Sequence, residues 1–550
     1  MTMTSELDKT PSATGKPVDD YTEDEAWQAE QSQLYTQAQH ALGFWDAVRL
    51  YRPAVLWSVV INIAVILKGF DGALVGSIVA LDPFKRQFGY EYNGEYVISA
   101  AWNGAFNYAN SIGGVIGALF SGWVYDRFGP KITLTACSVL SIACIFMEFF
   151  ATTPVVLFLG CLFNGTVIAF YPIVASAYIG EVCPLVLRGV AGSMVNLGFV
   201  VGQLIASAEL KGTNSLDTEW AYRIPYASQW VPAVLILVFV VFCPNSPWWL
   251  ARKGRIDGAK KALKRFTSSS SKIDITPTLA NIQHTLRLEA QLTKHHNYLD
   301  CFRGPDLRRL IIAVMVYSIQ PLSGQVLYVN YAVQFFERAG LDPSDAFSMN
   351  VGLTATGFVG TILAWPLISK LGRRPLYIWG TLGIALLLFL IGILDIIPQA
   401  QSGTNTAPIW AQCSLILLCL FIYDITIGPA CFTILTEIPS VQLRGMTIGL
   451  ATVSCHVWNI IFAVSIPYAI SQDEGDWRGK VGFLFSGIAV LCAAWCWGFL
   501  PETRGRTFEE LDLLFEKRVP AREFGRYVLE GSIKIPLCEK CAGTTRQAIM

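Results

Sequence analysis

Twelve long apolar stretches constrain this chain more than any other feature of its sequence. Each has about the length, roughly 20 residues, that a helix needs to cross the hydrocarbon layer of a bilayer. A single apolar stretch also fits a buried core helix, but twelve of them, separated by short polar turns, do not fit a soluble core. We therefore predict an all-α polytopic membrane protein with 12 transmembrane helices. The stretches lie near 53–80, 96–124, 132–151, 154–179, 189–209, 227–243, 309–335, 346–369, 375–396, 408–436, 445–470 and 480–500.

Basic residues are distributed unevenly between the two predicted sides of the membrane. With both termini in the cytosol, the cytosolic segments hold 33 of the 41 Lys and Arg residues, the outer loops hold 7, and Lys68 lies in the first stretch. Because Lys and Arg gather in cytosolic loops, we expect cytosolic termini. We also expect the plasma membrane as the location. The segment 1–52 is hydrophilic and acidic, which predicts no cleavable signal peptide. Acidic residues also number 41, so the basic excess usual in nucleic-acid-binding proteins is absent from the sequence.

Charged motifs near the ends of the stretches occur twice, once in each half of the chain. Glu181 and Arg188 recur as Glu437 and Arg444, with the same spacing and with a glycine after the arginine in both copies. Such repeats are typical of transporters whose two halves rock around a central binding site. They predict a 6+6 arrangement of spans. Its expected parts are a cytosolic N-terminal tail (1–52), a first six-helix half (53–243), a cytosolic linker with short helices (244–308), a second six-helix half (309–500) and a cytosolic C-terminal tail (501–550).

The repeated charges all fall at predicted cytosolic ends of spans. Acidic and basic groups there are able to pair between the halves when the inner side is closed, and to separate when it opens. The alternative is that the basic residues only anchor loops in the cytosol. We favour a cytosolic gate, because the motif occurs twice. Its expected members are Asp126, Arg127, Glu181, Arg188, Arg373, Glu437, Arg444 and Glu502.

Motifs in the first stretch, after the second and after the last carry a family resemblance. They are Gly69-Phe70-Asp71-Gly72, Gly122-x3-Asp126-Arg127-x-Gly129 and Pro501-Glu502-Thr503-Arg504-Gly505. Together they resemble the sugar porter family of the major facilitator superfamily. Further segments are similar to fungal maltose and general α-glucoside permeases: 247–250 with 253–257, 335–340, and 506–511 with 519–524. The resemblance implies the major facilitator fold, an α-glucoside substrate such as maltose, and proton symport.

The chain departs from those permeases at several positions. Lys68, Gly114 and Thr452 stand where the permeases usually carry Glu, a second acid and Arg, and Cys161 stands where many proton-coupled porters carry Arg. These departures keep a second hypothesis open: a facilitator or exporter of another small molecule, such as a fungal secondary metabolite, without proton coupling. A non-transporting sensor is disfavoured, because only about 50 residues follow the last stretch.

Ionisable side chains within membrane spans are costly and mark candidate functional sites. Lys68 and Asp71 lie three residues apart, on one face of the first predicted helix. They form either a pair that only packs this span, or a proton-coupling site in which Lys68 tunes Asp71. Asp424, in the middle of the tenth stretch, is a further proton-coupling candidate that we expect to line the cavity. Glu148 is expected at the membrane interface instead.

A sugar site needs planar amides for pairs of hydroxyl groups and aromatic rings for the apolar face of the sugar. The alternative for each such residue is a role in helix packing. By motif position, the candidates are Gln320, Asn196, Gln203, Gln325, Tyr328, Asn330, Phe432 and Asn459.

Nothing in the sequence indicates an enzyme, a cofactor or a catalytic residue. A phosphate-binding loop that ends in Gly-Lys-Ser/Thr is absent from the sequence. Cys538 and Cys541 have the spacing of metal ligands but no second pair, so we expect no metal. The expected partners are a small-molecule sugar, the lipid bilayer and, in one hypothesis, protons. We expect a monomer.

Overall fold

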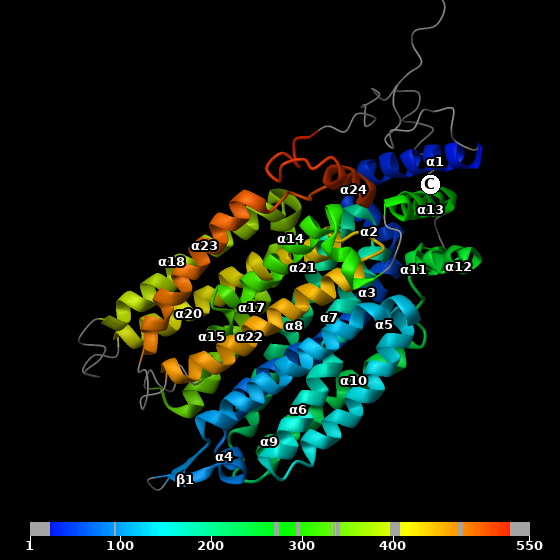
Figure 1. Ribbon diagram of the computed structural model, residues 1–550. Helices are drawn as coiled ribbons and strands as arrows, with labels where there is room; N and C mark the ends of the chain where they lie inside the picture. The colour runs from blue at the N-terminus through cyan, green and yellow to red at the C-terminus, as the bar shows by residue number, and fades with distance from the viewer. Residues whose placement is uncertain are drawn as a thin grey trace, which may run out of the picture.

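The computed structural model of the protein describes residues 23–92, 95–268, 274–292, 297–330, 332–333, 336, 341–396, 407–470 and 477–527. Figure 1 shows an elongated bundle of long helices with short helices at both ends. We call the end with α1 (Glu23–Ala41), α13 (Thr276–Leu292) and α24 (Phe508–Glu516) the capped end. The opposite end, which we call the hairpin end, carries α4 (Asp82–Phe88) and the antiparallel strands β1 (Tyr90–Tyr92) and β2 (Glu95–Val97).

The first half of the chain contains six spans. One continuous stretch, α5, holds two of them, because Gly129 (φ 81°, ψ 170°) breaks the helix directly before Pro130. Glycine adopts this positive φ without the steric cost of a side chain. The helices are α3 (Arg52–Ser77), α5 (Ala100–Phe149), α6 (Pro154–Ile168), α7 (Phe170–Val182), α8 (Leu185–Thr213), α9 (Trp220–Ser228) and α10 (Trp230–Val240).

The second half repeats this pattern. Gly372 (φ 94°) ends α17 at the place that corresponds to Gly129, and α18 begins at the next residue. The seventh span is α14, continued by α15. The helices are α14 (Gly304–Leu322), α15 (Gln325–Asn330), α17 (Pro343–Leu371), α18 (Arg373–Ile396), α20 (Ala407–Ile425), α21 (Ile427–Glu437), α22 (Arg444–Ile470) and α23 (Val481–Phe499).

The predicted all-α fold with twelve spans is confirmed. By length and composition, the described part of the chain has 10 helices able to cross a membrane, and the 49-residue helix among them contains two spans. The helix pair α14 and α15 supplies the remaining span. The other short elements are α2 (Phe44–Leu50), η2 (Ile78–Ala80), α11 (Pro247–Arg252), α12 (Ile256–Phe266), η3 (Tyr298–Phe302) and η4 (Arg478–Lys480).

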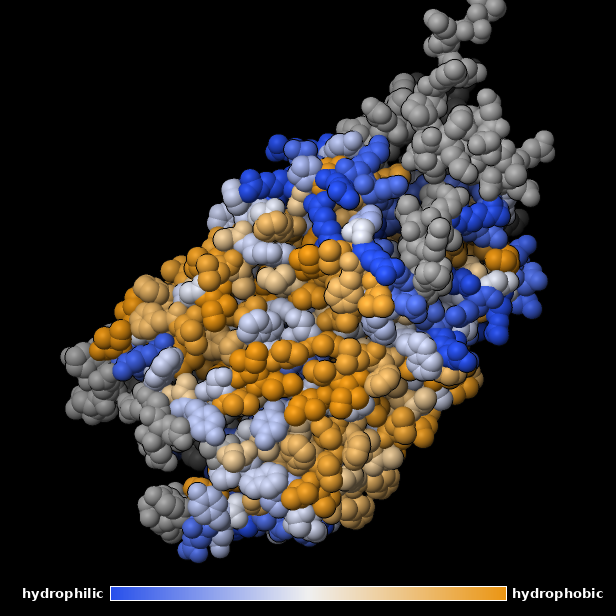
Figure 2. Space-filling view, viewed as in Figure 1, coloured by the Kyte–Doolittle hydropathy of each residue, from blue (hydrophilic) through white to orange (hydrophobic). Residues whose placement is uncertain are grey.

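The surface of the bundle carries a broad apolar belt. Figure 2 shows hydrophobic side chains over the middle of the molecule and hydrophilic side chains gathered at the capped end. Large apolar side chains such as Leu491, Trp379 and Leu56 are exposed on the outer faces of the spans. An exposed apolar surface of this extent is unfavourable in water and matches the hydrocarbon of a bilayer.

The two halves meet along α5, α7 and α8 on one side and α17, α21 and α22 on the other. Small residues allow close contact there: a Cβ on Gly122 would lie 2.7 Å from Cα of Met446, and one on Gly192 would lie 3.0 Å from Cα of Thr433. Nearer the hairpin end, Asn350 Nδ2 donates a hydrogen bond to Ser207 Oγ at 3.0 Å. The interface therefore runs between the halves through the centre of the bundle.

Candidate functional site

A polar contact crosses between the halves at the centre of the bundle. Asn196 on α8 donates from Nδ2 to Asp424 Oδ1 at 2.9 Å and to Thr361 Oγ1 at 3.1 Å. Asn196 and Asp424 are 3% and 1% exposed, and Asp424 Oδ2 is buried without a hydrogen-bond partner in the described part of the chain. A Cβ on Gly357 would collide with this oxygen, so the glycine makes room for the carboxylate.

Aromatic side chains lie beside this centre. Phe432 on α21 stacks on Phe199 of α8 across the interface, with ring centroids 5.4 Å apart and planes at 22°. Tyr317 meets Phe432 edge-on at 5.7 Å. Gln320, one turn further along α14, is buried, and its Nε2 has no hydrogen-bond partner among the described residues. Amide groups and aromatic rings are thus present on both sides of the interface. Asn196 and Phe199 belong to the first half, and Gln320 and Phe432 belong to the second.

The remaining predicted sugar ligands are less close together. Gln203 and Tyr328 border a narrow crevice that also includes Asn350, and Tyr328 packs edge-on against Tyr423 at 6.0 Å. Gln325 is partly buried at the start of α15. Asn330 is the last residue of the same helix, and its side chain lies outside the described part of the chain. Asn459 is partly buried on α22, and its amide contacts Cys455 Sγ at 3.7 Å. Among the described residues, Asn459 makes no hydrogen bond to Asn196 or Gln320.

Lys68 and Asp71 do not form a direct ion pair within 4.0 Å in the described part of the chain. Asn110 of α5 lies between them instead. Its Oδ1 accepts from Lys68 Nζ at 2.9 Å, and its Nδ2 donates to Asp71 Oδ2. The predicted shared helix face is present, but an amide from another helix separates the two charges. Sequence reasoning missed this residue, because an Asn in an apolar stretch carries no distinctive spacing.

Glu148, one residue before the end of α5, is buried within the bundle, and its predicted place at the membrane interface stays a prediction. It is 2% exposed and faces Asn164, whose Nδ2 lies 3.5 Å from Glu148 Oε2 and donates to Asp71 Oδ1 at 3.0 Å. Position near the end of a stretch suggested exposure. The physical reason for burial is Gly160 on α6, where a Cβ would lie 2.8 Å from Glu148 Cγ. Because Gly160 has no side chain, it leaves space for the Glu148 side chain inside the bundle.

The predicted gate residues gather at the capped end. Glu181 accepts hydrogen bonds from Tyr125 Oη at 2.9 Å and from Ser246 Oγ, and pairs with Arg252 at 3.1 Å. Arg444 of the second half approaches the same carboxylate at 3.9 Å. Glu181 of the first half faces the arginine of the second.

Each half also has its own fixed contacts at this end. Arg373 pairs with Glu437 at 2.6 Å, and Glu502 accepts from the backbone N–H groups of Arg373 and Arg374 at 3.1 Å each. Asp126 lies 3.5 Å from both Arg252 and Lys253. Arg127, in contrast, has no ion pair within 4.0 Å among the described residues and lies against aromatic rings, Trp123 at 5.7 Å and Phe128 at 5.9 Å.

A phenylalanine joins the two repeated arginines, which sequence reasoning missed. Phe508, at the start of α24, has the guanidinium carbon of Arg188 at 3.6 Å and that of Arg444 at 4.2 Å from its ring centroid. An aromatic ring between two cations stabilises both through cation–π attraction. Phe508 of α24 therefore contacts predicted gate residues from both halves of the chain.

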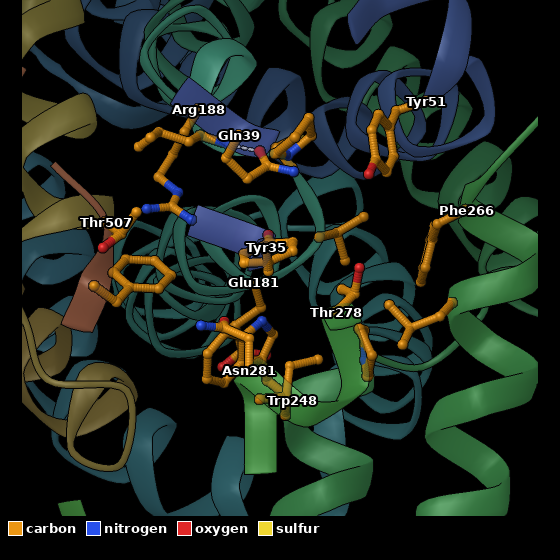
Figure 3. A pocket seen from close by; sticks show the side chains of 18 of the residues that line it. Tyr35, Gln39, Tyr51, Glu181, Arg188, Trp248, Phe266, Thr278, Asn281 and Thr507 are labelled. Atoms are coloured by element: carbon orange, nitrogen blue, oxygen red, sulfur yellow. Dashed lines mark hydrogen bonds between the residues drawn. The ribbon is translucent and has the colours of Figure 1, made fainter. Parts of the chain in front are cut away.

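The capped end contains a small pocket of about 50 Å³. Figure 3 shows Tyr35, Gln39, Arg188, Asn281 and Thr507 around it, from α1, α8, α13 and the segment before α24. Burial raises the pKa of Tyr35 above its ordinary value. The pocket is lined by the predicted gate residues Glu181 and Arg188 and does not lie at the centre of the bundle. It is therefore not a candidate sugar-binding site.

Comparisons with known proteins agree with this geometry. The family model described as "Sugar (and other) transporter" matches residues 57–515. The general alpha-glucoside permease of Saccharomyces cerevisiae is 32% identical over 493 residues, which cover 88% of this chain and 79% of the permease. Maltose permease MAL31 of the same yeast is 30% identical over 496 residues, 89% of this chain and 80% of the permease.

Solved structures with this fold include that of the proton:xylose symporter XylE bound to 6-bromo-6-deoxy-D-glucose. It superposes with a TM-score of 0.70 at 23% sequence identity, over 85% of this chain and 100% of that chain. An inward open conformation of the xylose transporter XylE from E. coli has a TM-score of 0.61 at 22% identity, over 83% of this chain and 98% of that chain. The chain therefore shares the fold of these transporters.

Proposed function

Because the chain belongs to the sugar transporter family of the major facilitator superfamily, we propose that it imports an α-glucoside such as maltose together with a proton. Membership makes it a multi-pass membrane transporter of sugars and not an enzyme. The α-glucoside, the proton, the plasma membrane, cytosolic termini and a monomeric state are the proposal. It draws support from the similarity to the yeast general alpha-glucoside permease and maltose permease.

The observation that carries the proposal is the contact between Asn196 and Asp424 at 2.9 Å beside the stacked rings of Phe199 and Phe432. These groups come from both halves, so a solute bound there bridges them. Amides and carboxylates form paired hydrogen bonds with sugar hydroxyls, and aromatic rings cover the apolar face of a pyranose. We assign Gln320 to the same site, because its buried amide has a free donor among the described residues. Gln203, Gln325, Tyr328, Asn330 and Asn459 stay secondary candidates.

Alternating access follows from the two halves and the gate in this proposal. The pairing of Glu181 with Arg444, together with the Phe508 ring, keeps the capped end closed while the solute enters from the hairpin end. Separation of these groups then opens the capped end. Asp71 is the proton-coupling residue in this scheme, since it is the acid of the first span and is fully buried.

The proposal is tested by uptake of labelled maltose and glucose into proteoliposomes, with an imposed proton gradient and with a protonophore. We expect maltose to accumulate with the gradient and to equilibrate without it. Gln320→Leu should raise the KM for maltose about tenfold, since a lost hydrogen bond of roughly 1.4 kcal/mol corresponds to that factor.

Gln412→Leu is the matched control, because Gln412 is a buried amide of α20 whose Nε2 donates to the Ile391 carbonyl at 3.5 Å. It should leave the KM unchanged. An absence of maltose and glucose flux in the unmodified protein would overturn the proposal and favour the second hypothesis, a facilitator or exporter of another small molecule.

A further inference from the structure

Five buried polar side chains form a continuous chain through four spans of the first half. Lys68 and Asp71 come from α3, Asn110 and Glu148 from the two spans of α5, and Asn164 from α6. Their exposed fractions are 9%, 0%, 7%, 2% and 0% in that order. Only Asp71 and Lys68 were expected in this region from the sequence.

Each asparagine links two ionisable groups. Asn164 donates from Nδ2 to Asp71 Oδ1 at 3.0 Å and approaches Glu148 Oε2 at 3.5 Å, while its Oδ1 accepts from Ser141 Oγ at 3.3 Å. Asn110 links Lys68 to the second oxygen of Asp71. Both oxygens of Asp71 are therefore hydrogen-bonded. Glu148 has one bonded oxygen, and its Oε1 is buried with no partner in the described part of the chain.

The cluster contains one cation and two carboxyl groups. The other titratable side chains that face Glu148 are those of Cys144, Cys161 and Tyr226. Thiols and phenols, with ordinary pKa values of about 8.5 and 10, are neutral near pH 7. On the opposite side, Cys455 and His456 of α22 face Lys68. A buried imidazole beside an ammonium group favours its neutral form, so it adds no charge.

Charge balance then fixes the number of protons. A buried net charge is costly in a membrane span. With Lys68 charged, the two carboxyl groups are neutralised together only when they hold one proton between them. We propose that Asp71 and Glu148 share a single proton and that Glu148 holds it while the capped end is closed, because Asp71 has the hydrogen bonds that stabilise a carboxylate.

This inference rests on the proposed proton symport and names its second acid. The cluster binds the proton as a carboxyl O–H, and release leaves two carboxylates against one ammonium group. The released state carries an uncompensated negative charge, which ties proton release to a conformation that lets water reach the cluster. Glu148 thus acts on coupling and does not touch the sugar.

The first test counts protons without transport. In infrared difference spectra of the purified protein, protonated carboxyl groups give a C=O band distinct from that of carboxylates. Asp71→Asn and Glu148→Gln should each lose one such group, because the remaining carboxylate pairs with Lys68. Lys68→Met should gain one, since both acids are then neutral.

The double variant Lys68→Met/Glu148→Gln is the matched control, because one acid without a cation again holds one proton. Its band should return to the unmodified intensity. A purely structural role for Glu148 does not predict this return. Bands that stay unchanged in Glu148→Gln, or in Lys68→Met, would overturn the inference even if a variant were less stable.

The second test separates coupling from transport. Glu148→Gln should lose proton-driven accumulation of maltose, so that its inside-to-outside ratio falls to about one, while maltose counterflow stays within about twofold of the unmodified protein. Full accumulation in this variant would reject the shared proton and leave the proposed function intact. A lack of proton-dependent accumulation in the unmodified protein would instead reject the proposed symport.

Discussion

Glu181 carries contacts from three elements at the gate. Tyr125 and Arg252 bind its carboxylate directly at 2.9 Å and 3.1 Å, and Arg444 reaches it from the other half at 3.9 Å. We predict that Glu181→Gln destabilises the closed gate by about 3–5 kcal/mol, because removal of one member leaves buried charges uncompensated. Faster hydrogen–deuterium exchange at the start of α8 measures this opening.

Asp126→Asn is the control for that prediction. Asp126 also meets Arg252, at 3.5 Å, but its side chain is 29% exposed. Solvent-exposed ion pairs contribute only about 0–1 kcal/mol. Exchange should therefore change little in Asp126→Asn, and equal effects of the two variants would contradict the assignment of Glu181 to the gate.

Glu510 predicts a pH dependence outside the membrane. Burial raises the pKa of its carboxyl, but hydrogen bonds from His40 and from the Thr507 backbone, with the charges of His40 and Arg506, outweigh burial and lower the pKa below its ordinary value of 4.5. Because the pKa of Glu510 is lower in the folded state, its ionised carboxylate stabilises the contact of α1 with α24 at pH values above the ordinary pKa. This stabilisation is lost as the pH falls through the lower, folded-state pKa.

The measurement is proteolysis of α1 as a function of pH. We expect α1 to become more accessible as the pH falls below about 4.5. Glu510→Gln should make it accessible at every pH, whereas Glu516→Gln, at the exposed end of α24, should behave as the unmodified protein does. A pH response retained in Glu510→Gln would assign the effect to another group.

At the residue scale, the sequence predicted which charged side chains are buried in the spans better than it predicted their partners. Lys68, Asp71 and Asp424 stood out because charges are rare in apolar stretches. Asn110 separates Lys68 from Asp71, yet an amide in a span looks like any packing residue in sequence. The burial of Glu148 was not predicted, because the distance to the end of a stretch does not reveal the room that Gly160 leaves for this side chain on another helix.

Helix packing between α5 and α6 depends on glycine. A Cβ on Gly113 would contact the Leu162 carbonyl oxygen and lie 2.7 Å from the Thr166 backbone nitrogen. We predict that Gly113→Ala destabilises the protein by about 1–3 kcal/mol, because backbone atoms cannot move aside as side chains do. The measurement is the thermal unfolding midpoint in detergent.

Gly104→Ala, in the same span of α5, provides the comparison. Its Cβ would find no atom closer than 3.7 Å, which is ordinary contact. Its unfolding midpoint should stay close to that of the unmodified protein. If both alanine variants unfold alike, close approach of α5 and α6 does not limit stability.

At the element scale, hydropathy predicted the number and order of the spans, because about 20 apolar residues have few other solutions. Interruptions within spans were less visible. The break between α20 and α21 falls at Thr426 (φ −126°, ψ −78°), and α15 follows α14 after a turn at Gly324. Residues that disfavour helices lie at both breaks, Gly428-Pro429 and Ser323-Gly324. Such residues do not always break a helix, because Pro366 lies inside the continuous α17.

Phe508 connects the halves at the scale of the whole molecule. Its ring lies between Arg188 of the first half and Arg444 of the second. We predict that Phe508→Leu, which retains an apolar side chain but loses the ring, weakens the closed gate by about 1–3 kcal/mol, since each buried cation–π contact contributes about 0.5–2 kcal/mol. Spin-label distances across the capped end measure the increase in the open population.

Phe515→Leu is the matched variant for this test. The Phe515 ring meets Arg308 and Arg309, which both belong to the second half. The distance distribution across the gate should therefore stay unchanged in Phe515→Leu. A shift of the same size in both variants would indicate a general loss of α24 packing instead of a contact between halves.

At this scale, the repeated motifs predicted two similar halves, and the fold agrees with the solved transporters. The sequence led us to expect pairs between the halves, but it did not identify Arg444 as the residue that Glu181 faces. Such a pairing depends on how the halves are placed against each other. Each half alone offers both charges with identical spacing.

The two ends of the described chain also contact each other. Ser32 of α1 donates to Glu509 of α24 at 2.9 Å, and His40 lies 3.5 Å from Glu510. The segment that carries Phe508 is therefore tethered from outside the spans, and in the proposed transport cycle opening of the capped end works against this tether. Because the contacts of α1 with α24 favour the closed capped end in that scheme, we expect a substitution confined to them to shift the resting orientation while the solute site stays the same.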